Sequence, residues 1–126
     1  YQVRAVPRKA STAPGTPKQQ RRGQNAPKGR VVPADLWQAQ VPMRPNSMVL
    51  TRDVLFICGV PFFEDAPKLR ESIAGTKGGV LIALDQKSGE LLSQTTLPAA
   101  GGWDGMGAAR GSLFITKMDG SVSCYR

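Results

Sequence analysis

The close spacing of turn signals from residue 34 onward most constrains what this chain can fold into. Short apolar or alternating segments stand between turns such as RD at 52–53 and MDGS at 118–121. Two-residue turns containing Gly or Asp join antiparallel strands, so residues 34–126 are predicted to be all-β. The exception is a long loop at 59–78, in which DAPKLRESIAG has room for one or two helical turns.

Residues 1–33 differ from the rest in composition and charge, being rich in Pro, Gly and Gln. Of the 17 Lys and Arg residues, eight lie in the first 30 positions, which hold no acid; the other nine are balanced by all nine Asp and Glu. Such a segment cannot bury enough apolar surface to offset its ordering entropy, so we expect a disordered basic linker over 1–33. Binding of an anionic polymer by this tail is one functional alternative. A nucleic-acid partner is not favoured, because the remainder of the chain is neutral.

Two cysteines and no histidine restrict the available chemistry. Cys58 and Cys124 form no CxxC pair, which excludes a Cys/His zinc site and a histidine base. We expect each to be a small buried strand residue, with a disulfide as the alternative. The sequence shows no oxygen-rich calcium loop, phosphate-binding glycine loop or paired nucleophile and base, so we assign no catalytic, cofactor or metal residue. No apolar run approaches the ~20 residues of a membrane span.

The chain contains an internal repeat. NSMVLTRDVLFICG and DGMGAARGSLFITKMDG align with Phe56 matching Phe114, an offset of 58 residues that includes the long loop. Without that loop the period is about 40 residues, the size of a propeller blade. The alignment predicts one blade of four strands, the first three strands of a second blade, and an outer strand of a preceding blade at 36–41. The predicted blade strands are 47–51, 54–58, 79–85 and 90–97, followed by 105–109, 112–117 and 121–125.

The stretch GGVLIALDQKSGELL resembles the repeat of pyrroloquinoline-quinone-type (PQQ-type) β-propellers, and GSLFITKMDGSVSCY resembles another part of the same repeat. The resemblance implies antiparallel four-stranded propeller blades, about two of them, in the C-terminal portion of a larger bacterial propeller. It also implies an extracytoplasmic location, either periplasmic or at the cell envelope. The matching positions, to which the resemblance gives packing and turn roles, are Gly79, Ala83, Asp85, Gly89, Asp119 and Gly120.

One position departs from this pattern. Where the family repeat has a Trp that docks between blades, this chain has Ser93. A docked aromatic side chain buries ~150–250 Å², which Ser cannot replace. Trp37, in the earlier outer strand, is the candidate for a retained docking residue.

The resemblance implies a non-catalytic scaffold or a module that binds a protein or ligand. The expected partners are the remaining propeller blades or another protein. The alternative is part of a quinone-dependent dehydrogenase, in which blades outside this chain would hold the catalytic residues, PQQ and calcium. We expect the residues of this chain itself to take no part in catalysis.

Four residues form the candidate binding surface: Phe62, Phe63, Trp103 and Asp104. The two Phe residues lie in the long loop, where they either form an exposed apolar patch or fold back over their own blade. Asp104 follows a Gly-rich joint at the start of a blade, and we favour a turn role for it over a ligand role.

Overall fold

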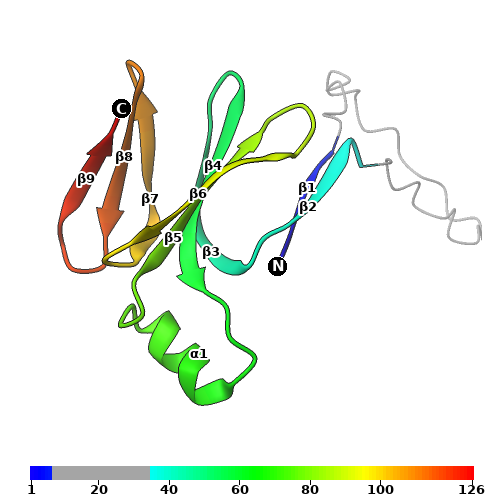
Figure 1. Cartoon of the computed structure of the whole chain (residues 1–126). Coiled ribbons are helices and arrows are strands. Elements are labelled where there is room, and N and C mark those ends of the chain that lie inside the picture. Colours follow the sequence, from blue (N-terminus) through cyan, green and yellow to red (C-terminus); the bar gives the residue numbers. More distant parts are fainter. Residues whose placement is uncertain (7–34) are drawn as a thin grey trace, which may run out of the picture.

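The computed structural model describes residues 1–6 and 35–126, and most of these residues lie in antiparallel strands (Figure 1). The strands form sheets of two, four and three strands, with the orders β1-β2, β3-β4-β5-β6 and β7-β8-β9. A short helix, α1 (Ala66–Ile73), lies between β4 and β5. The strand bounds are Gln2–Ala5 (β1), Trp37–Gln40 (β2), Met43–Leu50 (β3), Val54–Pro61 (β4), Gly79–Asp85 (β5), Leu91–Leu97 (β6), Gly101–Ala109 (β7), Ser112–Lys117 (β8) and Val122–Tyr125 (β9).

The expectation of a mostly β fold is confirmed, and the predicted hairpins occur in the predicted order. The sheets are open, so the propeller itself stays a prediction. Two strands begin earlier than expected. β3 begins at Met43 because a register shift between Pro45 and Ser47 lets the strand pass the proline, which has no N–H to donate. β7 begins at Gly101 through a similar irregularity before Met106.

The prediction of disorder for residues 1–33 is wrong for the first strand. Gln2–Ala5 pair with β2, with Val3 opposite Ala39 and Ala5 opposite Trp37. Val3 packs against the core, so even this short segment buries apolar surface. Residues 7–34 of the expected linker lie outside the described part of the chain.

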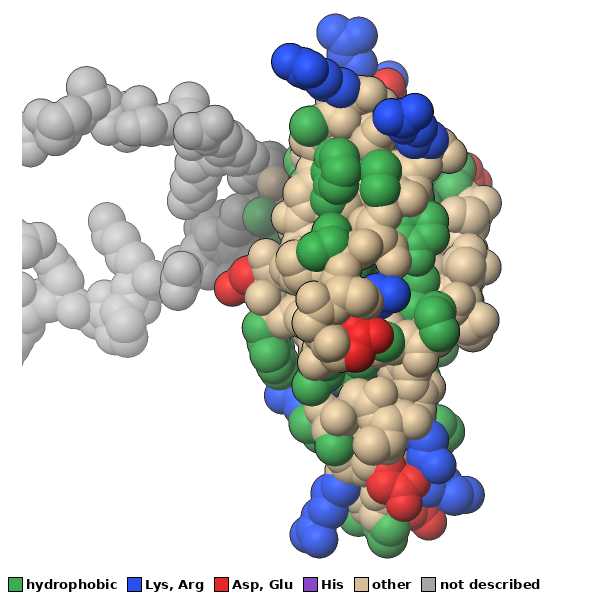
Figure 2. Space-filling view, turned by 90° about the vertical axis from the view of Figure 1, so that its left-hand side faces the viewer, with side chains coloured by type: hydrophobic (Ala, Val, Ile, Leu, Met, Phe, Trp, Pro, Cys, Tyr) green, Lys and Arg blue, Asp and Glu red, His purple; other side chains and the backbone are tan. Residues whose placement is uncertain are grey.

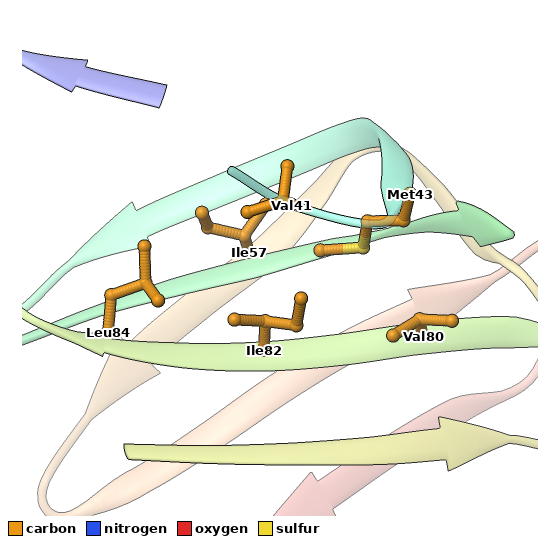
Figure 3. Close-up of a cluster of buried hydrophobic side chains, with 6 residues drawn as sticks. All are labelled: Val41, Met43, Ile57, Val80, Ile82 and Leu84. Carbon is orange, nitrogen blue, oxygen red and sulfur yellow. The ribbon is translucent and has the colours of Figure 1, made fainter. Parts of the chain in front are cut away.

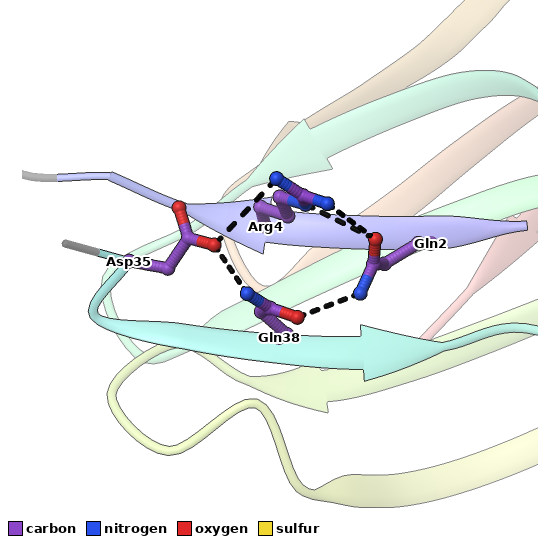
Figure 4. Close-up of polar contacts among 4 residues, drawn as sticks. All are labelled: Gln2, Arg4, Asp35 and Gln38. Carbon is purple, nitrogen blue, oxygen red and sulfur yellow. Dashed lines mark hydrogen bonds and ion pairs between the residues drawn. The ribbon is translucent and has the colours of Figure 1, made fainter. Parts of the chain in front are cut away.

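A polar network joins β1 to β2 on the outer side of this small sheet (Figure 4). The Gln2 amide donates to Gln38 at 2.7 Å and accepts from the Arg4 guanidinium at 2.8 Å. Arg4 also lies 3.8 Å from Asp35, which accepts a hydrogen bond from Gln38. Gln2, Arg4 and Gln38 are exposed and only Asp35 is partly buried, so we attribute the pairing of the two strands mainly to Val3 and the backbone ladder.

The long loop contains the helical segment that the sequence allowed. Asp65 caps α1 by accepting a hydrogen bond from the Lys68 N–H at 3.0 Å, and Pro67 lies in the first turn. The helix ends before Gly75, whose φ of 83° suits a residue without a side chain. Buried Ser72 donates its hydroxyl to the Pro61 carbonyl and thereby holds the helix against the end of β4.

One apolar layer lies between the β1–β2 sheet and the four-stranded sheet (Figure 3). Alternate residues of β4 and β5 point to this side, and Trp37 and Ala39 of β2 pack onto them. This arrangement follows from the two-residue period of a strand. The buried members are Val41, Met43, Ile57, Val80, Ile82 and Leu84.

A second apolar layer lies between the four-stranded sheet and the β7–β9 sheet. Its buried members are Cys58, Leu97, Leu113 and Ile115. The Asn46 amide donates to the Gly101 carbonyl at 3.0 Å inside this layer and joins β3 to β7. The three sheets are therefore stacked in series. Strands β4 and β5 are covered on both faces, whereas β6 is exposed except at Leu97.

The two cysteines occupy different environments. Both are free thiols, so the alternative of a disulfide is wrong. Cys58 is buried as expected, and burial raises the pKa of its thiol. The expectation for Cys124 is wrong, because this residue is exposed on β9 at the edge of the last sheet, where no further described sheet covers it.

Truncation at adjacent positions of β8 tests the second layer. Ile115 is fully buried whereas its neighbour Phe114 is 41% exposed. Ile115→Ala should lower the free energy of unfolding by about 2–4 kcal/mol, because it removes buried methyl groups and leaves a cavity. Phe114→Ala should cost about 1 kcal/mol or less. Urea unfolding followed by circular dichroism measures both, and equal losses would contradict the assigned faces of β8.

Candidate functional site

Trp37 joins the first sheet to the turn between β5 and β6. Its indole Nε1–H donates to the Gln86 carbonyl at 2.8 Å. The ring lies so close to Gly89 that a Cβ built there would be 2.5 Å from the indole Cε3. Gly89 also has a φ of 75°, so both the close approach and the backbone conformation require glycine. The residue singled out as a docking Trp thus contacts the turn of the next sheet.

Asp85 shapes the turn that receives Trp37. One carboxylate oxygen accepts hydrogen bonds from the backbone N–H groups of Lys87 and Ser88, each at 2.8 Å. Donation by the Ser88 and Lys87 N–H groups lowers the pKa of Asp85. The Gly89 N–H closes the turn by donating to the Asp85 carbonyl at 2.9 Å. This geometry directs the Gln86 carbonyl to the indole.

Asp119 occupies a comparable turn between β8 and β9. Its carboxylate accepts from the Ser121 hydroxyl at 2.6 Å and from the Ser121 N–H at 2.9 Å. These bonds lower the pKa of Asp119, the hydroxyl having the larger effect. Gly120 in this turn has a φ of 83°. The contacts of Asp119 are therefore local to the hairpin.

Gly79 and Ala83 are packing positions on β5. A Cβ at Gly79 would lie 3.1 Å from both the Ala100 Cα and the Ala99 carbonyl oxygen. Ala83 is 5% exposed and lies opposite Phe56 on β4 and Ser93 on β6. Both positions keep β5 close to its neighbours.

The four residues of the predicted binding surface have different partners. Phe62 is partly exposed and meets the Tyr1 ring edge-to-face with centroids 5.5 Å apart, while Phe63 is half-buried. Trp103 is 62% exposed and lies under the Arg44 guanidinium, 5.4 Å from the ring centroid. Asp104 follows it with a φ of 50° inside the irregular part of β7, which is a turn-like conformation. These contacts do not bring the four side chains together into one site.

A groove opens between the four-stranded sheet and the β7–β9 sheet, at the end where the β3–β4 and β7–β8 turns lie. Its volume is about 680 Å³. Sequence reasoning missed this groove because its walls come from two different sheets, whose strands are far apart along the chain. The only sequence signal was the repeat that places Phe56 and Leu113 in matching strands. Its lining includes apolar side chains from both sheets and the two cations Arg110 and Arg126.

Within residues 1–6 and 35–126 no group of His, Cys, Asp and Glu side chains is placed to hold a metal ion. The one described helix, α1, is too short to cross a membrane. No protein-family model, curated protein or solved structure matches this chain. The resemblance to the PQQ-type repeat therefore stays a hypothesis that rests on the residues quoted above.

Two glycines with the same φ give a matched test of the contact between Trp37 and Gly89. Gly89 and Gly111 both have a φ of 75°, but a Cβ at Gly111 would meet nothing within 4 Å. Gly111→Ala should cost about 1–2 kcal/mol of unfolding free energy through backbone strain alone. Gly89→Ala should cost at least about 1 kcal/mol more, because the indole must shift. Thermal or urea unfolding measures the difference, which should disappear when Trp37 is also replaced by Ala; an unchanged difference would refute the contact.

The lowered pKa of Asp85 predicts a dependence of stability on pH. A carboxyl whose folded pKa lies below its usual 3.8 contributes stability above that pH and loses it as the pH falls through the lowered value. Asp85→Asn keeps an oxygen that accepts the two N–H bonds but no longer titrates. Its urea midpoint should therefore decline less than the wild-type midpoint between about pH 5 and pH 2. Asp53→Asn, at a turn carboxylate with no hydrogen bond among the described residues, is the control.

Proposed function

We propose that this chain is part of a PQQ-like β-propeller that acts as a non-catalytic scaffold and binds a further β-sheet, either of remaining blades or of a partner protein. The main support is the outward face of the β7–β9 sheet. It has the same residue pattern as the face of the four-stranded sheet that the β7–β9 sheet covers. We call this surface the open face and define it by Phe114, Val122 and Cys124.

Phe114 and Phe56 hold equivalent places in the two sheets. Phe56 pairs with Ala83 of the next strand, and Phe114 pairs with Cys124 of the next strand. Phe56 packs into the layer between the sheets. Phe114, by contrast, is 41% exposed. A residue that is covered in one repeat and exposed in the next marks a surface suited to one more sheet.

The open face combines apolar side chains with an unpaired edge. Val122 is 63% exposed, and Figure 2 shows apolar side chains on this side of the molecule, below a group of Lys and Arg at its upper end and above acidic side chains. Among the described strands none pairs with the outer edge of β9. A partner strand could add to this edge through backbone hydrogen bonds while its side chains extend the apolar face.

The contact between Trp37 and Gly89 supports the same proposal. It shows one way in which successive sheets of this chain are joined, through an indole on one sheet and a glycine turn on the next. The extracytoplasmic location implied by the resemblance is part of the proposal.

Sedimentation velocity over a range of protein concentrations tests the open face. Without its partner sheet, the protein should associate with itself through exposed Phe114, and Phe114→Glu should shift it to the monomer because a buried carboxylate is unfavourable. Leu92→Glu is the matched control, since Leu92 is 54% exposed on β6. A wild-type protein that stays monomeric, or equal effects of the two substitutions, would overturn the assignment of this face.

A further inference from the structure

We propose that the groove between the two larger sheets binds a small amphipathic anion, a molecule with an apolar aliphatic or aromatic body and one carboxylate. This ligand site is separate from the open face, because the groove lies on the opposite side of the β7–β9 sheet. The inference therefore does not rest on the proposed scaffold role.

The walls of the groove provide the contacts for an apolar body. Val49, Phe56 and Leu81 come from the four-stranded sheet, and Leu113 and Tyr125 come from the β7–β9 sheet. Val49 lies opposite Phe56 and Leu113 lies opposite Tyr125, so the members of each pair share one face of their sheet. These side chains pack in the layer between the two sheets. The volume of about 680 Å³ lies within the roughly 300–1,000 Å³ typical of small-molecule sites.

Charge at the groove favours an anion. Arg110 and Arg126 line it, and no Asp or Glu belongs to its lining. Neither arginine forms an ion pair with an acid among the described residues. Arg110 also sits in a tight turn with a φ of 49°, followed by Gly111 with a φ of 75°. The turn fixes the backbone of this cation at the mouth of the apolar walls, where a guanidinium can pair with a carboxylate.

The backbone of the walls favours a small molecule over an added peptide strand. Val49 and Phe56 belong to the paired strands β3 and β4, and Leu113 lies on β8, which is paired on both sides. The N–H and C=O groups of β4 and β8 are used on both sides within their own sheets, whereas β3 is an edge strand paired only with β4. What remains for an occupant is side-chain surface and the arginine charge, which suits an alkyl or aromatic carboxylate.

Three probes of equal chain length separate binding of the apolar body from pairing of the carboxylate with the arginines. They are decanoate, decanol and decyltrimethylammonium, each used below the concentration at which it forms micelles. Binding is measured by shifts of the backbone amide signals of Gly111 and Leu113 in nuclear magnetic resonance spectra. Decanoate should bind about fivefold or more tightly than decanol, and decyltrimethylammonium should bind most weakly, because only the carboxylate pairs with the arginines.

Substitutions at Ala108 test the charge without disturbing the core. Ala108 is exposed and lines the groove beside Arg110. Ala108→Glu should weaken decanoate binding roughly fivefold, and Ala108→Lys should preserve or strengthen it. Arg110→Gln should also weaken binding, whereas Lys68→Gln, the same loss of charge on α1, should have no effect.

Several outcomes would overturn the inference. These are equal affinity for decanoate and decanol, equal binding by Ala108→Glu and Ala108→Lys, or amide shifts that do not include Gly111 and Leu113. Displacement of decanoate by an acidic peptide of extended sequence but not by a second short carboxylate would assign the groove to a peptide instead. Loss of decanoate binding as the protein self-associates would assign it to a second copy. Phe114→Glu should leave decanoate binding unchanged, so a failure here is distinguishable from a failure of the scaffold role.

Discussion

Burial of both faces of β4 and β5, the middle strands of the four-stranded sheet, is the constraint on which the rest of the structure depends. Strands β4 and β5 carry apolar side chains on both sides, so residues such as Ile57 and Phe56 point in opposite directions into two different layers. A sheet of this kind is stable only when other elements cover each face. The β1–β2 pair covers one face, and the β7–β9 sheet covers the other. The serial stacking of sheets is the direct result.

The same rule explains why the last sheet has an exposed apolar face. β8 repeats the pattern of β4, so it too carries apolar residues on both sides, but only the side with Ile115 meets another described sheet. Phe114 on the other side is left partly exposed. The groove lies on the opposite side of that sheet. There, near the β3–β4 and β7–β8 turns, side chains do not fill the space between the two larger sheets. One repeat pattern thus accounts for the proposed docking face, and the incomplete filling between sheets accounts for the proposed ligand site.

The turns show how far local chemistry could be predicted. Asp85 and Asp119 bond to backbone or side-chain groups two or three residues ahead, contacts that depend on sequence neighbours alone. The strand pairings around Phe56 and Phe114 could likewise be predicted from the repeat. The contacts of the candidate surface of Phe62, Phe63, Trp103 and Asp104 were harder to predict, because the partners come from other elements. Tyr1 meets Phe62 edge-to-face, and the Arg44 guanidinium lies over Trp103. No neighbouring residue indicates such contacts.

The sequence by itself determined the hairpins from β3 onward, their order and which residues of a strand share a face, because turn chemistry and the two-residue period act over a few residues. The tertiary structure alone decided which sheets meet. It paired Gln2–Ala5, from a segment expected to be disordered, with β2. It also placed the Trp37 ring against Gly89 and Arg110 beside the groove. These contacts join residues far apart along the chain, and they depend on how whole sheets pack to remove apolar surface from water.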